Sequence, residues 1–153
     1  MVARRVPVYP TMDSALDALP FATPIRVRRR ARADLPPTLD SLERSRELVT
    51  EWLTVWSQAD LIPVTRVVVT TFVENVLQHT DSRPQVRLET DGVTVTVAVE
   101  DSCNTPAAVR EGDWSHNAPS GLLIVAALCR SWGNAPTPGG KTVWAVIGPE
   151  NRL

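Results

Sequence analysis

The chain has 153 residues, of which 43% are hydrophobic and 22% charged, and its formal net charge at pH 7 is −1. These values are typical of one soluble globular domain, and so small a net charge excludes an overall field that would draw the chain to nucleic acid or to an anionic membrane. The longest apolar run, residues 122–129, is much shorter than the about 20 residues that a membrane-spanning helix needs. Cys103 and Cys129 fit no metal-ligand or redox spacing, and no signal-peptide pattern is present, so we expect a cytoplasmic protein with reduced thiols.

Residues 1–24 contain four prolines and no sustained hydrophobic period, which predicts an extended or poorly ordered arm ahead of a domain at 25–153. Five arginines follow within residues 25–34. A nucleic-acid surface would interleave aromatic side chains with this charge, and none is present. We therefore expect an edge strand whose charged side chains discourage pairing with another chain, and no direct nucleic-acid partner.

Two helices are predicted next. Residues 39–56 place larger side chains at alternating spacings of three and four, which is typical of an amphipathic helix. Residues 57–63 form a turn, and Pro63 stands where a second helix over 64–80 can begin. The stripe of the first helix is formed by Leu39, Leu42, Arg46, Val49, Leu53 and Trp56.

The rest of the chain alternates strands with one more helix. Residues 85–90 and 93–100 alternate apolar and polar side chains, and Asp91-Gly92 between them predicts a two-residue hairpin. Residues 102–120 show no pattern, which favours a lid or a binding loop. A helix over 121–131, a turn and a last strand over 141–147 complete an α+β fold, with an antiparallel sheet and its helices on one side.

The second helix carries polar side chains where a core face is expected. At 100° per residue, Asn75 and His79 lie on the same face as Val68 and Phe72. Burying an amide group without a hydrogen-bond partner destabilises the fold by about 1–3 kcal/mol. Such an amide therefore either forms a hydrogen bond with nearby backbone or faces a cavity that holds a polar ligand. Both interpretations stay open for this pair. The face comprises Val64, Val68, Thr71, Phe72, Asn75 and His79, while Thr70, Glu74 and Gln78 lie on the opposite flank.

Three more positions suit a ligand. Asp101 ends a strand at the mouth of the long loop, where its carboxylate can accept from an amine and a water. Gly121 opens a helix, whose free backbone amides suit a phosphate. Thr142 begins the last strand, and its hydroxyl could join Asp101. Each residue also has an ordinary role in a turn, cap or strand, but in this order they describe a nucleotide pocket.

From about residue 25 to 147 the chain resembles the histidine-kinase-like (GHKL) ATPase domain. It is most similar to the bacterial anti-sigma factor serine kinases and to the small ATP-binding regulators of actinobacteria. The resemblance lies in four motifs, which are NVLQH at 75–79, VEDS at 99–102, SGLLIVAALCRSWG at 120–133 and GGKTVWAVI at 139–147. The last two motifs are the most specific.

The resemblance implies a Bergerat-type two-layer α/β sandwich that binds ATP with Mg²⁺. Asn75 would coordinate Mg²⁺ and help to hold the phosphates, and Asp101 would bind the adenine amine. Gly121 and Leu122 would offer backbone amides to the phosphates, and Thr142 would support Asp101.

The resemblance also implies protein partners, namely a sigma factor, an anti-sigma antagonist, or both, and a homodimer is usual among the similar proteins. His79 would occupy a position near the lid. The family's general base is a glutamate four residues before the asparagine, and Thr71 stands there instead. A threonine hydroxyl accepts a proton poorly at neutral pH, which places serine phosphorylation in doubt.

Glycines that the family uses near the nucleotide are also replaced, by Cys103, Thr105 and Pro119. Two functions therefore stay open. The chain is either an ATP-binding regulator of the anti-sigma-factor type that phosphorylates an antagonist, or a non-catalytic binding module of the same fold with weak or no nucleotide binding.

Overall fold

The computed structural model describes residues 28–102 and 119–153, so the expected arm at 1–24 and nearly all of the expected loop at 102–120 lie outside the described residues. The described chain forms one five-stranded antiparallel sheet in the order β1-β2-β3-β5-β4. The strands are β1 (Arg29–Asp34), β2 (Gln85–Thr90), β3 (Val95–Asp101), β4 (Ser131–Thr137) and β5 (Gly140–Ile147).

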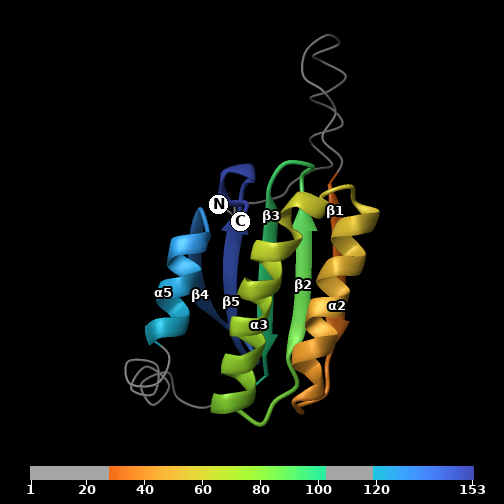
Figure 1. Ribbon diagram of the computed structural model, residues 1–153. Coiled ribbons are helices and arrows are strands. Elements are labelled where there is room, and N and C mark those ends of the chain that lie inside the picture. The colour runs from red at the N-terminus through yellow and green to blue at the C-terminus, as the bar shows by residue number, and fades with distance from the viewer. Residues whose placement is uncertain (1–27, 103–118) are drawn as a thin grey trace, which may run out of the picture.

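Three α-helices lie on one face of this sheet, with α3 between the other two (Figure 1). They are α2 (Asp40–Val55), α3 (Ile62–His79) and α5 (Pro119–Leu128), and two 3₁₀ turns, η1 (Ala59–Leu61) and η2 (Pro149–Asn151), complete the described chain. The predicted α+β architecture, with an antiparallel sheet and helices on one side, is confirmed. No described helix combines the length and the apolar composition that crossing a bilayer requires.

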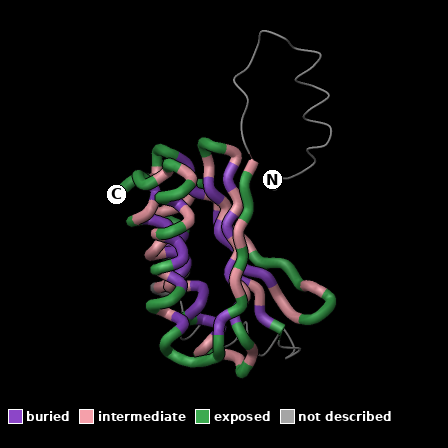
Figure 2. Tube along the Cα trace, turned by 90° about the vertical axis from the view of Figure 1, so that its right-hand side faces the viewer, coloured by how far each residue is buried: buried purple, intermediate pink, exposed green. Residues whose placement is uncertain are grey.

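The core lies between the helices and the sheet, where buried segments of the two layers face each other (Figure 2). Every second side chain of β3 and β5 points into it, because side chains alternate between the faces of a strand. The α3 helix supplies the other side, since its valines and Phe72 are buried. The sheet residues of this face include Val86, Leu88, Val95, Val97, Val99, Val143, Ala145 and Ile147.

The opposite face of the sheet carries charged side chains. Arg87 lies 3.8 Å from Glu100, and Arg30 lies 3.7 Å from Glu89. The predicted edge position of the arginine-rich segment is confirmed, because among the described strands β1 pairs only with β2, and its Arg29, Arg30 and Arg32 are exposed. Such charge discourages another chain from adding to the edge.

The buried face of α2 differs from the predicted stripe. Leu39 is 76% exposed, and the buried face instead contains Ser41 and Ser45 together with leucine and valine side chains. Both serines can be buried because their hydroxyls donate to backbone carbonyls, Ser41 to Pro36 and Ser45 to Leu42 at 2.8 Å. Two small serine side chains with hydrogen bonds inside the protein thus belong to the buried face of α2, for which the sequence pattern suggested larger side chains.

Reciprocal hydrogen bonds join the outer sides of α2 and α3. Arg46 Nη1 donates to Thr70 Oγ1, and Arg66 Nη1 donates to Thr50 Oγ1, each at 3.3 Å. Each threonine hydroxyl donates in turn to the backbone carbonyl of the arginine four residues before it on its own helix, Thr50 to Arg46 and Thr70 to Arg66. These pairs link α2 and α3 along their outer sides.

Strand β4 was not predicted from the sequence. It contains Gly133, Asn134 and Pro136, which are poor strand formers, and its apolar residues do not alternate with polar ones. It forms because it pairs with β5 along its whole length while its other side is a sheet edge, where proline is tolerated.

The hairpin between β2 and β3 is longer than predicted. Thr90 pairs with Val95, so four residues and not two connect the strands. The Asp91 carboxylate accepts hydrogen bonds from the backbone amides of Val93 and Thr94, both at 2.8 Å. Gly92 has a φ of 94°, which a residue with a side chain rarely adopts.

Replacing Thr65 by valine should stabilise the protein. Thr65 is fully buried, and its Oγ1 has no hydrogen-bond partner within residues 28–102 and 119–153. Valine keeps the shape and removes the unpaired hydroxyl, so we expect the free energy of unfolding to rise by about 1 kcal/mol, measured by urea denaturation. The matched control Val69→Thr introduces a hydroxyl at a fully buried position of the same helix and should lower this free energy. A loss of stability in Thr65→Val would contradict the assignment.

Candidate functional site

Four chain segments meet at one end of the molecule, the lower end in Figure 1. They are the C-terminal end of α3, the C-terminal end of β3, the N-terminal end of α5 and the start of β5. The residues that the sequence nominated as ligand contacts lie on these segments. The topology therefore gathers them at the same end of the sheet.

Asn75 is buried near the end of α3, with 8% of its surface exposed. Its Nδ2 has no hydrogen-bond partner among the described residues. A buried donor in this state costs about 1–3 kcal/mol, and an acceptor such as a phosphate oxygen would remove that cost. His79 lies one turn further on and is half-buried. Of the two interpretations of Asn75, this geometry favours the polar ligand.

Asp101 is the last residue of β3 and is 5% exposed. Gly140 lies directly against it: a Cβ on Gly140 would be 2.8 Å from the Asp101 carbonyl carbon and 2.9 Å from its Oδ1. Glycine is therefore the residue that lets β5 approach the Asp101 backbone and carboxylate so closely. Nothing in the local sequence pattern distinguished Gly140 from Gly139, which has open space around it.

The register of β3 against β5 separates Thr142 from Asp101. Thr142 pairs with Glu100, whereas Lys141 pairs with Asp101. Paired residues point to the same face, so Lys141 shares the helix-covered face with Asp101, and Thr142, although buried, lies on the other face. The expectation that the Thr142 hydroxyl joins Asp101 is therefore not met. The alternation of core residues from Val143 onward could have indicated this position for Lys141.

Helix α5 begins at Pro119, two residues before the predicted start. Proline suits the first turn of a helix because its missing amide hydrogen would have no acceptor there. Gly121 and Leu122 belong to this first turn, whose backbone amides are not used within the helix. The predicted phosphate-binding amides thus lie at the same end of the molecule as Asn75 and Asp101.

Thr71 occupies the position expected for a general base. Its hydroxyl donates to the backbone carbonyl of Val67 at 3.0 Å, and its methyl carbon would lie 3.3 Å from a Cβ on Gly121. The side chain is thus used in contacts within α3 and against α5. It offers no carboxylate that could take a proton from a nucleophile.

The described residues would hold Mg²⁺ only together with a nucleotide. No group of three or more His, Cys, Asp or Glu side chains forms a candidate metal site in the described ranges. Mg²⁺ commonly takes one or two protein ligands and completes its shell with phosphates and water. The Asn75 amide fits one such ligand, with its oxygen for the metal and its nitrogen for a phosphate.

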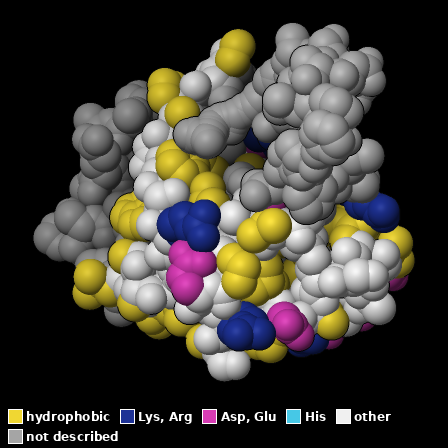
Figure 3. Space-filling view, turned by 90° about the horizontal axis from the view of Figure 1, so that it is seen from above, with side chains coloured by type: hydrophobic (Ala, Val, Ile, Leu, Met, Phe, Trp, Pro, Cys, Tyr) yellow, Lys and Arg dark blue, Asp and Glu magenta, His cyan; other side chains and the backbone are white. Residues whose placement is uncertain are grey.

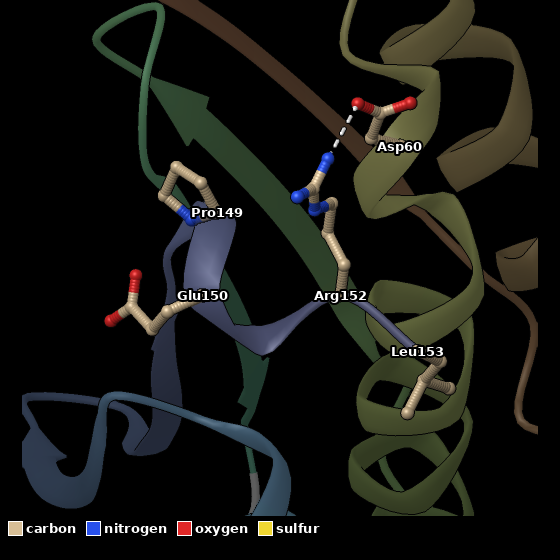
Figure 4. Close-up of a pocket in the computed structure, with 5 residues that line it drawn as sticks. All are labelled: Asp60, Pro149, Glu150, Arg152 and Leu153. Atoms are coloured by element: carbon tan, nitrogen blue, oxygen red, sulfur yellow. Dashed lines mark hydrogen bonds and ion pairs between the residues drawn. The ribbon is translucent and has the colours of Figure 1, made fainter.

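A surface hollow of about 530 Å³ lies at the opposite end, lined by Asp60, Pro149, Glu150, Arg152 and Leu153 (Figure 4). Figure 3 looks onto this end, where basic and acidic side chains lie beside each other among hydrophobic ones. Arg152 lies 3.4 Å from Asp60, and Arg130 donates two hydrogen bonds to Glu150 at 2.8 and 2.9 Å. The hydrogen bond from Arg130 lowers the pKa of the Glu150 carboxyl from 4.5 to about 2. The charged groups of this hollow thus have partners within the protein.

Asn75→Leu should increase stability. Leucine has a similar branched shape but no buried donor, so we expect the free energy of unfolding to rise by about 1 kcal/mol. Urea denaturation measures the change. A fall in stability would show that the Asn75 amide is bonded inside the protein and would remove the argument for a ligand.

Gly140→Ala should disturb the junction of β3 and β5, whereas Gly139→Ala should not. The new methyl group at residue 140 would overlap the Asp101 backbone, while that at residue 139 meets no atom within 4 Å. We expect faster amide hydrogen exchange at the β3 end and a loss of stability of about 1–3 kcal/mol in Gly140→Ala. Equal behaviour of the two variants would contradict the close contact.

No family model and no curated protein matches the sequence. Among solved structures, the chain is similar to the crystal structure of the RsbU and RsbW domains of a Mycobacterium tuberculosis protein. The TM-score is 0.54 and the identity 19%, over 78% of this chain and 32% of that chain. The chain thus spans about a third of the structure that it matches. At this identity the likeness shows that the two share a fold.

Proposed function

We propose that the protein is an ATP-binding regulator of the anti-sigma-factor type, which binds protein partners in the cytoplasm. Mg²⁺-ATP would lie between the ends of α3 and β3 and the start of α5. The observation that carries this proposal is Asn75, whose buried amide lacks an acceptor within the described residues and shares an end of the molecule with the buried Asp101 carboxylate. The resemblance of motifs 75–79, 99–102, 120–133 and 139–147 to histidine-kinase-like ATPases supports the same site.

The partners in this proposal are a sigma factor, an anti-sigma antagonist, or both, with a second copy of the chain as a further candidate. The matched structure contains an RsbW domain, and the sequence motifs resemble the anti-sigma factor serine kinases. Helix α5 supports a protein contact, because it contains no charged residue and exposes Leu123 by 68% and Ile124 by 48%. Exposed neighbouring apolar side chains are typical of surfaces that bind proteins.

We further propose that the protein holds its nucleotide with little or no phosphoryl transfer. The Thr71 hydroxyl donates to its own helix, and a Cβ on Gly121 would lie 3.3 Å from the Thr71 methyl carbon. Positioning and charge neutralisation supply most of the catalysis of phosphoryl transfer, so a small residual activity is compatible with this site. A full kinase would need a proton acceptor where Thr71 stands.

Calorimetric titration with Mg²⁺-ATP tests the nucleotide site. We expect binding by the wild type and a loss of affinity of at least about tenfold in Asn75→Ala and in Asp101→Ala, because each change removes a hydrogen-bonding group of the ligand. Asp60→Ala, which removes an exposed carboxylate at the opposite end, should bind as the wild type does. No binding by the wild type at millimolar ATP would overturn the nucleotide proposal and leave a module that binds proteins alone.

Release of ADP during prolonged incubation with Mg²⁺-ATP then tests catalysis. The wild type should release almost none. Thr71→Glu should restore little, because the longer side chain meets the first turn of α5 at Gly121. Rapid turnover by the wild type would contradict the proposal of a non-catalytic site.

A further inference from the structure

The sixteen basic residues of the chain include a single lysine, Lys141, and the others are arginines. Lysine differs from arginine in presenting a compact ammonium with three donors on a flexible stem. Lys141 is half-buried and is the second residue of β5, directly after Gly140. The one lysine therefore lies at the end of the molecule where the candidate nucleotide site is formed.

The register makes Lys141 the cross-strand partner of Asp101. Paired residues of antiparallel strands project from the same face with Cβ atoms about 4.5–5.5 Å apart. Gly140 allows the two strands to approach closely at this point. An acceptor and a donor of opposite charge thus lie side by side where β3 ends and β5 begins.

Such a pair matches the edge of a purine. Adenine offers a donor, its exocyclic amine, beside the acceptor N1, so it can bind one carboxylate oxygen and the ammonium. Guanine offers two adjacent donors, N1–H and its exocyclic amine, beside the acceptor O6. Both oxygens of one carboxylate can accept from guanine while the ammonium donates to O6.

We propose that Lys141 is a second base-contacting residue, and that the Asp101–Lys141 pair lets the site accept guanine nucleotides as well as adenine nucleotides. This inference rests on the proposed nucleotide site. It goes beyond that site because it adds a second side chain to the base contact, with an ammonium that can donate to O6 of guanine or to N1 of adenine. The affinities for Mg²⁺-GTP and Mg²⁺-ATP should agree within about tenfold, since both bases satisfy the pair.

Chemical labelling of the single lysine tests whether a bound nucleotide covers Lys141. An amine-reactive N-hydroxysuccinimide ester can modify only Lys141 and the amino terminus of this chain, and mass spectrometry quantifies each. At nucleotide concentrations tenfold above the dissociation constant, we expect Mg²⁺-GTP and Mg²⁺-ATP each to slow the modification of Lys141 by about tenfold. The amino terminus serves as the internal control. A nucleotide that binds but leaves Lys141 as reactive as before would overturn the inference.

Titration of Lys141→Met with both nucleotides tests the base contact. Methionine keeps a linear stem without the charge, and loss of the donor to O6 of guanine or to N1 of adenine should weaken GTP and ATP each by about tenfold. Arg152→Met removes a positive charge at the opposite end and should leave both affinities unchanged. Unchanged affinities in Lys141→Met, or ATP binding without GTP binding by the wild type, would refute the role of Lys141 alone. Failure of the wild type to bind either nucleotide would refute the nucleotide site and this inference together.

Discussion

The register of β3 against β5 determines which side chains face the helices. A shift by one residue would exchange the two faces of a strand and expose its buried set. In the observed register, Val97 and Ala145 form one cross-strand pair beneath the helices, and Val99 and Val143 form the next. The following pair on the same face is Asp101 and Lys141. The hydrophobic core and the candidate site are therefore successive rows of one pattern, and a change in the register would destroy both.

Helix α3 joins the two regions from the other side. Its middle part packs in the core through Val68 and Phe72, and its last turns carry Asn75 and His79. The change from apolar to polar side chains occurs where the ends of the strands and of α5 come together. At this boundary Gly121 lies close to Thr71, because a Cβ on Gly121 would be 3.3 Å from the Thr71 methyl carbon. The first turn of α5 and the helix that holds Asn75 are therefore neighbours at the candidate site.

The elements with a clear hydrophobic period were predicted from the sequence. A strand that forms only by pairing with a neighbouring strand was missed. The helical period of α3 and the alternation of β3 come from side chains that pack locally, so the positions of both elements were predictable. The buried face of α3 is wider than predicted, because Thr65, Val69, Val73 and Val76 are buried as well. Strand β4 depends on β5 as its partner, and no local pattern in residues 131–137 reveals that dependence. The buried Ser41 and Ser45 were missed for a related reason, since a hydroxyl bonded to the backbone can be buried as readily as an apolar group. At the site, Asn75 and Asp101 were nominated from their place in the pattern. The exchange of Thr142 for Lys141 beside Asp101 required the cross-strand register, which a single strand cannot supply.

The segment after β5 folds back as η2 and is fastened to the body of the domain. Arg130 binds Glu150 through two hydrogen bonds, and Arg152 lies beside Asp60. The exposed Leu153 therefore ends the chain at the end of the molecule away from Asn75 and Asp101 (Figure 1). A protein immobilised on a sensor surface through Leu153 would accordingly be attached at the end opposite the candidate site, with the α3–β3 end turned towards the solution and accessible to small molecules and proteins that flow past.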